Sequence, residues 1–349
     1  MPFVAQGRNL TSIFSYLMLS VTQALRLLKQ CGNLVHCKLN ITLDYPQPLF
    51  GNPASQELPD VTPLRGVAYL PHLISLSIVE DIPDDNSATQ FYAAIESPNV
   101  RWLDYQRPDR SFFEGPEGPQ VSLAHPPIFA LLRRLTQLKM LTVDPRGFLP
   151  AHLCEALEMV SPTLTHLAIG QDSAQAVRAD MRMRRRRHNP LYHSPKLFDL
   201  DWLRDSSLKT GYPSDADGPS NDPALTSKIL LPHLEILDWS TGSCLDELLL
   251  QFLTERMDPR ASQYGIAILK HIWIAFQRVQ ELDVPAEFAR FRERKMAETG
   301  VEIPEVKLEL DYLSKEPVKD DEPLSAVFGL TPDGRSWFYD DFREWFLPK

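Results

Sequence analysis

The sequence predicts an α/β fold in which helices alternate with parallel strands along a stack of short repeated units. One phrase of the form x-L-x-x-L-x-I recurs along most of the chain, and a helical pattern precedes most copies. The chain of 349 residues also exceeds the usual size of one compact core. It therefore forms either two domains or one elongated array.

The copies of the phrase begin at loosely regular intervals. Each ends in an alternation of apolar and polar residues, which is typical of a half-buried strand. A unit of this kind cannot bury both its faces alone, so neighbouring copies stack with their strands parallel. This predicts an irregular leucine-rich-repeat-like solenoid. The copies start at Leu34, Leu73, Val100, Leu138, Leu164, Leu234 and Leu269, with a weaker one at Leu197.

A doubly wound α/β domain is the alternative fold, because it also alternates strands with helices. Buried parallel strands in such a domain are continuously apolar. The strands predicted here alternate apolar with polar residues, which leaves one face of the sheet to solvent. The pattern therefore favours the solenoid.

Helical periodicity indicates six helices. Two have start signals, Ser87 before the second and Pro150 in the first turn of the fourth. The first covers an apolar stretch that also raises the question of a signal peptide or membrane span, but its spacing favours an amphipathic helix packed on a core. The predicted helices are 12–30, 88–96, 128–135, 149–160, 245–257 and 285–297.

The pattern divides the chain into four parts. Residues 1–170 form an N-terminal repeat half, 171–230 a weakly patterned insertion or linker, and 231–300 the C-terminal repeats. Residues 301–349 are acidic and end in an aromatic run, which predicts either a cap on the open end of the stack or a docking tail. Two proline-rich excursions, 44–63 and 107–127, interrupt the N-terminal half.

Composition narrows the function classes. The net charge of −10 disfavours a general nucleic-acid binder, and we expect no membrane span. The four cysteines lack a CxxC pair, which fits a reducing compartment, either cytoplasmic or nuclear. The basic run Arg184–Arg187 is either a nuclear-localisation patch or a solvated surface.

Sequence motifs for catalysis and cofactor binding do not occur. The phosphate-binding GxxxxGK[ST], the dinucleotide-binding GxGxxG, HExxH, GxSxG and EF-hand spacings are absent. Histidines 36, 166 and 271 fall in separate copies, and four ligands at zinc spacing do not appear. We therefore expect no cofactor, no metal and no enzymatic activity.

Residues between the apolar positions of each phrase point to the opposite face of the sheet and are the candidates for binding a protein. Trp102 and Trp273 lead this set because aromatic residues commonly anchor interfaces. Packing beneath a covering loop is the alternative for each. The full set is Trp102, Asp104, Met140, Thr142, His166, Asp238, His271 and Trp273.

Three segments carry a family resemblance. Residues 24–37, 70–76 and 231–237 look like the leucine-rich-repeat region of fungal F-box proteins, and the resemblance covers roughly residues 20–275. It implies a substrate-receptor domain of a ubiquitin ligase, with ligase components among the partners. No F-box-like Leu-Pro-x-Glu-Leu opening precedes residue 20. We therefore expect a non-enzymatic protein-binding module without its F-box. The alternatives are a hydrolase or transferase with its site in the proline-rich insertions, and a structural scaffold.

Overall fold

The computed structural model describes nine parts of the chain. They are residues 10–42, 66–82, 85–107, 125–145, 148–170, 200, 230–242, 244–276 and 278–312. Several predicted features lie outside them: the weak copy at Leu197, the run Arg184–Arg187, the aromatic run after residue 335, and most of both proline-rich excursions.

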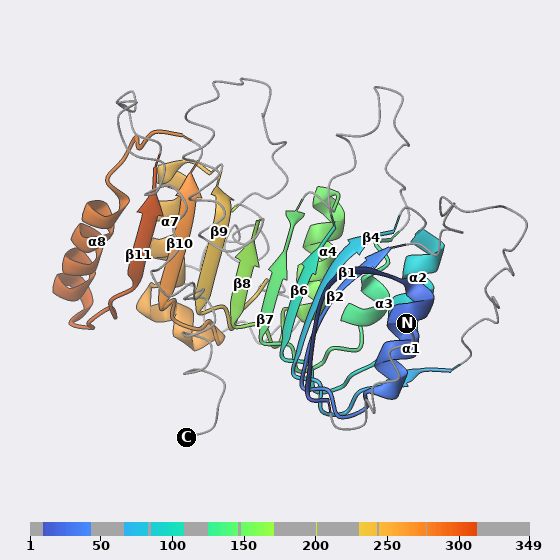
Figure 1. The fold of residues 1–349 in the computed structure, drawn as a ribbon. Helices are drawn as coiled ribbons and strands as arrows, with labels where there is room; N and C mark the ends of the chain where they lie inside the picture. Colours follow the sequence, from blue (N-terminus) through green and yellow to red (C-terminus); the bar gives the residue numbers. More distant parts are fainter. Residues whose placement is uncertain are drawn as a thin grey trace, which may run out of the picture.

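A parallel sheet of nine strands forms the centre of the molecule (Figure 1). Its strands follow one another in chain order, and each pairs with its neighbour in parallel. They are β1 Ser12–Ser20, β2 His36–Thr42, β4 Ser75–Asp81, β6 Trp102–Gln106, β7 Met140–Val143, β8 His166–Ile169, β9 Ile236–Gly242, β10 His271–Phe276 and β11 Lys307–Asp311. A two-stranded sheet joins β3 Ala68–Tyr69 to β5 Ile95–Glu96.

Helices line one side of the sheet in the same order (Figure 1). Consecutive helices contact one another, α1 with α2, α2 with α3, α3 with α4, and α7 with α8. The sheet is curved, so that β10 is seen face-on while β1 is seen nearly edge-on. The helices are α1 Val21–Gln30, α2 Asp85–Ala93, α3 Phe129–Leu132, α4 Pro150–Val160, α7 Asp246–Arg256 and α8 Val284–Thr299, with a 3₁₀-helix at Pro259–Tyr264.

The apolar positions of the repeated phrase align across the sheet. One row of paired residues runs through Leu76, Leu103, Leu141, Leu167 and Leu237, and each of these side chains is at most 1% exposed. Side chains alternate between the two faces of a strand, so this row faces the helices and its neighbours face away. The fold is therefore α/β with a parallel central sheet, as the sequence predicts.

The prediction of one helix over residues 12–30 is wrong in its first half. Residues 12–20 form β1 at the edge of the sheet, and α1 begins only at Val21. Ser20 caps α1 through a capping box with Gln23. The helical spacing misled because Ile13, Leu17 and Val21 lie four residues apart, and that interval fits both a strand period of two and a helix period of 3.6.

The sheet continues across the segment predicted as a linker. β8 pairs directly with β9, although residues 170–235 lie between the two strands in the sequence. It also continues into the segment predicted as a cap, because β11 pairs with β10 along its whole length. Helices α4, α7 and α8 match the predicted ranges to within two residues, while α3 is shorter than predicted.

Candidate protein-binding face

Three rows of side chains cross the face of the sheet that points away from the helices, and we call them the outward rows. The first joins His36, Ser75, Trp102, Met140, His166, Ile236, His271 and Lys307. The second joins Phe14, Lys38, Ser77, Asp104, Thr142, Ala168, Asp238, Trp273 and Glu309. The third begins with Met18, Asn40, Val79 and Gln106. The eight candidate residues therefore lie on one face, within the first two rows.

Polar contacts connect neighbouring strands along these rows. Ser77 donates its hydroxyl hydrogen to Asp104 Oδ2 over 2.8 Å, and His166 Nε2 donates to Asp238 Oδ2 over 2.9 Å. His271 Nε2 lies 3.7 Å from Glu309 Oε2. Side chains directly or diagonally opposite on adjacent strands are close enough for such pairs. Polar contacts between side chains therefore link neighbouring strands on this face.

His36 adds another contact near the N-terminal end of the first row. Its Nδ1 atom shares a hydrogen bond of 2.8 Å with the Ser75 hydroxyl. Partial burial of the ring lowers the pKa of His36 below the ordinary value of 6.5. The imidazole is therefore mostly neutral at pH 7.

Two candidates are more buried than their place on this face led us to expect. Trp273 is 5% exposed and donates its indole N–H to Asp311 Oδ2 on β11, 3.2 Å away. Met140 is 1% exposed and sits in its row between Trp102 and His166, whose bulky rings flank it. Both side chains are therefore packed against their neighbours in this structure, and a role for them in binding stays a prediction.

The other six candidates are partly exposed: Trp102, Asp104, Thr142, His166, Asp238 and His271. The side chains of His166 and Asp238 are 16% and 25% exposed although they contact each other. Sequence reasoning missed Phe14 and Met18, which are 48% and 46% exposed on β1. Both lie in the segment whose spacing predicts a helix, although the aromatic and β-branched content of residues 13–16 favours a strand.

Three of the four cysteines have buried side chains. Cys31, Cys37 and Cys244 are buried, while Cys154 is half-buried. Burial, with a smaller contribution from Cys31, raises the pKa of Cys37 to about 12. Within the described ranges, no cluster of three or more His, Cys, Asp or Glu side chains has the arrangement of a metal site.

Among the described residues of the N-terminal half, Glu80 has the most enclosed carboxylate. Its side chain is fully buried and accepts hydrogen bonds from the hydroxyls of Tyr92 (2.7 Å) and Tyr105 (3.0 Å). Arg107 Nε lies 3.5 Å from its other oxygen and also binds Asp85. Burial raises the pKa of Glu80 above 4.5, and the arginine and the two tyrosines oppose that effect. These contacts join β4, α2 and β6 beneath the sheet.

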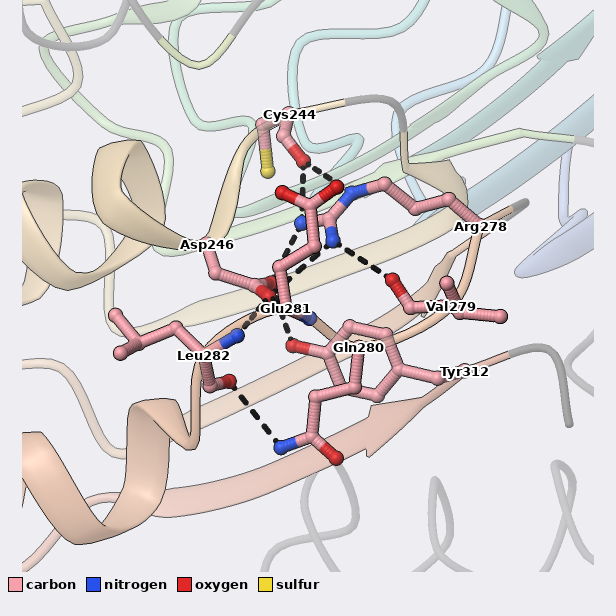
Figure 2. A network of polar contacts seen from close by, with 8 residues as sticks. All are labelled: Cys244, Asp246, Arg278, Val279, Gln280, Glu281, Leu282 and Tyr312. Carbon is pink, nitrogen blue, oxygen red and sulfur yellow. Dashed lines mark hydrogen bonds and ion pairs between the residues drawn. The ribbon is translucent and has the colours of Figure 1, made fainter. Parts of the chain in front are cut away.

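Asp246 is the corresponding carboxylate of the C-terminal half, and Figure 2 shows it surrounded by donors. It accepts from both terminal nitrogens of Arg278, from the Tyr312 hydroxyl (2.7 Å), and from the backbone N–H groups of Glu281 and Leu282, both 2.9 Å away. Burial alone would raise the pKa of Asp246, but these hydrogen bonds outweigh it and hold the pKa below 3.8. The network ties the start of α7 to the residues before α8.

Arg278 is also held by aromatic rings. Its guanidinium lies 4.8 Å from the centre of the Phe276 ring, which stacks on Tyr312 with 4.5 Å between ring centres. The same guanidinium donates to the Cys244 carbonyl over 2.8 Å. The end of β10 and the residue after β11 are thereby fixed to the turn that precedes α7.

Arg256 is a buried cation near the start of β9. It is 2% exposed and donates to the carbonyl of Leu231 over 2.9 Å, while the Leu231 N–H donates to Ser161 Oγ over 2.7 Å. Leu231 has a φ of 55°, which is unusual for a residue with a side chain. Burial lowers the pKa of Arg256 to about 10. These contacts hold the residues that precede β9 against the C-terminal end of α4.

Comparison with known proteins adds no identification. No protein-family model matches the chain, and none of the curated proteins matches it. Of the helices in the described ranges, none combines the length and the apolar character needed to cross a membrane.

Proposed function

We propose that the chain is a leucine-rich-repeat-like solenoid that binds a protein partner on the outward face of its sheet, without enzymatic activity. The strand register is the observation that supports this best. Nine strands in chain order bring side chains from distant copies into continuous rows, while the helices cover the other side. Stacked repeats use such extended surfaces for binding.

The composition of the outward rows also supports a protein partner. They combine aromatic, small, polar and charged residues, and several of these side chains are partly exposed. Interfaces between proteins are typically mixed in this way, with aromatic side chains near their centre. The net charge of −10 argues against a polyanion as the usual ligand.

A narrower form of the proposal rests on the family resemblance alone. The likeness of residues 24–37, 70–76 and 231–237 to fungal F-box repeat regions favours a substrate receptor of a ubiquitin ligase. In this form the acidic, aromatic end of the chain caps the stack beyond β11. That end lies outside the described residues from position 313 onward.

Photocrosslinking from two positions tests the proposal. A benzophenone amino acid is placed at Thr142, on the outward rows, or at Arg294, on the exposed side of α8. We expect specific protein adducts from position 142 and not from position 294. Equal labelling from both positions, or none from 142, would remove the outward face as the binding surface.

The ubiquitin link has a separate readout. The protein that crosslinks at position 142 is purified and incubated with ubiquitylation enzymes, with and without the chain fused to an F-box. A receptor should increase its ubiquitylation. Unchanged ubiquitylation would remove the ligase role and leave protein binding intact.

A further inference from the structure

The outward face is more apolar and more exposed at its N-terminal end, on β1. There, β1 places Phe14 opposite Lys38 and Met18 opposite Asn40 in the second and third rows. Phe14 and Met18 are 48% and 46% exposed, and Leu17 between them is 76% exposed. Large apolar side chains that gather at a surface indicate a contact site more strongly than scattered ones.

Lys38, opposite Phe14 on β2, differs from the other charged side chains of the outward rows because it has no partner among the described residues. Along the outward rows, the other charged side chains have partners: Asp104 with Ser77, Asp238 with His166, Glu309 with Lys307, and Asp311 with Trp273. Asp144 has contacts of its own. Lys38 is half-buried as a residue and makes no hydrogen bond or ion pair with the described residues.

We propose that Phe14, Met18 and Lys38, which we call the β1–β2 end, bind an extended acidic and apolar segment of the partner protein. An aliphatic or aromatic side chain of the segment packs on Phe14 and Met18. A neighbouring carboxylate reaches the ammonium of Lys38. This inference rests on the proposed function and specifies the chemistry of the partner.

The two contacts have different roles. Burial of apolar area against Phe14 and Met18 supplies most of the affinity. A single pair of charges at a partly exposed position adds little affinity but selects the sign of the partner's charge. The site therefore discriminates between acidic and basic segments through Lys38.

A second copy of the chain fits the β1–β2 end less well. Edge-to-edge pairing needs a regular strand, but the register of β1 shifts between Phe14 and Met18. Irregularities of this kind are a common protection of edge strands against pairing. Self-association through β1 would also leave Lys38 without an anion, since residues 12–20 contain no acidic side chain.

Peptide display on the full-length protein tests the inference. A library of random twelve-residue peptides is selected in parallel on the wild type and on three variants. They are Lys38→Glu, Phe14→Ser with Met18→Ser, and Arg26→Glu, which applies the same charge change to an exposed arginine on α1. Circular dichroism melting verifies that each variant is folded. The replaced side chains are largely exposed or half-buried, so folding should be retained.

The wild type and Arg26→Glu should enrich peptides in which Asp or Glu neighbours Leu, Phe or Trp. Lys38→Glu should bind those peptides at least about tenfold more weakly and enrich basic residues instead. The Phe14 and Met18 double variant should lose enrichment, whereas Val301→Ser, at a similarly exposed apolar residue, should keep it.

Two results would overturn the inference: no charge preference on the wild type, or the same peptides from wild type and Lys38→Glu. The proposed function fails independently of this test. If crosslinking from Thr142 identifies a partner whose binding survives Lys38→Glu and the double variant, the outward face remains the binding surface and the β1–β2 end does not contribute.

Discussion

His166 Nε2 lies 2.9 Å from Asp238 Oδ2, although the two residues are 72 positions apart in the chain. His166 is aligned with Ile236 and Asp238 with Ala168, so the contact runs diagonally between β8 and β9. It joins the last strand of the N-terminal half to the first strand of the C-terminal half on the outward face.

The His166–Asp238 pair should contribute little to stability. Both side chains keep contact with solvent, at 16% and 25% exposure, and partly exposed pairs are typically worth about 0.2–1 kcal/mol. A double-mutant cycle with His166→Ala and Asp238→Ala, measured by urea unfolding at pH 6, should give a coupling energy in that range. A coupling above about 2 kcal/mol would mean that the pair is shielded from solvent far more than its exposure indicates.

Gly170 should not tolerate a side chain. A Cβ atom there would lie 1.5 Å from Ser240 Oγ and 2.7 Å from Ser240 Cβ, and the residue has a φ of +130°. Gly170→Ala should therefore lower the free energy of unfolding by about 2–4 kcal/mol through overpacking and backbone strain. Gly32→Ala is the control, because its Cβ would meet no atom within 4 Å. Equal melting temperatures for the two variants would contradict the close approach of β8 to β9.

Periodicity predicted the inward row well because burial imposes it at every copy. Leu76, Leu141, Leu167 and Leu237 recur at one place in the phrase, and the structure aligns them. The outward rows were harder to predict, since burial there depends on neighbouring strands and not on position in the phrase. Trp273 is buried because β11 contributes Asp311 beside it, and β11 was not recognised as a strand.

The buried carboxylates were not predicted either. Asp246 and Glu80 have no distinguishing local pattern, because their partners come from other elements, such as Tyr312 and Arg107. A contact between residues 66 positions apart, as between Asp246 and Tyr312, exists only after the strands are in register.

Asp246→Asn should destabilise the protein strongly. The side chain is fully buried and pairs with Arg278, and removal of one partner of a buried pair typically costs about 3–5 kcal/mol. Glu247→Gln, at the next and exposed position of α7, should cost less than about 0.5 kcal/mol. Urea unfolding at pH 7 measures both. A cost below about 1 kcal/mol for Asp246→Asn would show that the network in Figure 2 contributes little.

The contribution of the Asp246 network to stability should decrease at low pH. The pKa of Asp246 is lowered in the folded protein, so the folded state binds this proton more weakly than the unfolded state does. Its stabilisation is complete above the ordinary value of 3.8 and disappears as the pH falls through the folded pKa. The stability difference between wild type and Asp246→Asn should therefore shrink as the pH falls below 4. A constant difference down to pH 2 would contradict the lowered pKa.

Glu80 should show the opposite pH dependence. Its pKa is raised above 4.5, so the folded state binds the proton more tightly than the unfolded state. This contribution is complete below 4.5 and is lost as the pH rises through the folded pKa. Wild type should therefore lose stability relative to Glu80→Gln as the pH increases from 4 to 8. A difference that grows in favour of wild type over this range would mean that Arg107 dominates the pKa of Glu80.

Trp273→Ala should affect stability more than Trp102→Ala. Trp273 is 5% exposed, and truncation of a buried tryptophan typically costs about 3–5 kcal/mol. Trp102 is half-buried and should cost less. Thermal melts of both variants give the comparison. The same loss of stability in both would indicate that the two rings are equally enclosed.

The junction between β8 and β9 also determines what happens when the chain is cut. Thr165 accepts backbone hydrogen bonds from Glu235 and Ile236, and Ser161 accepts one from Leu231. None of these bonds depends on an unbroken chain between residues 171 and 229. Two separately produced pieces, one ending after β8 and one beginning before β9, should therefore recognise each other and rebuild the whole sheet on mixing.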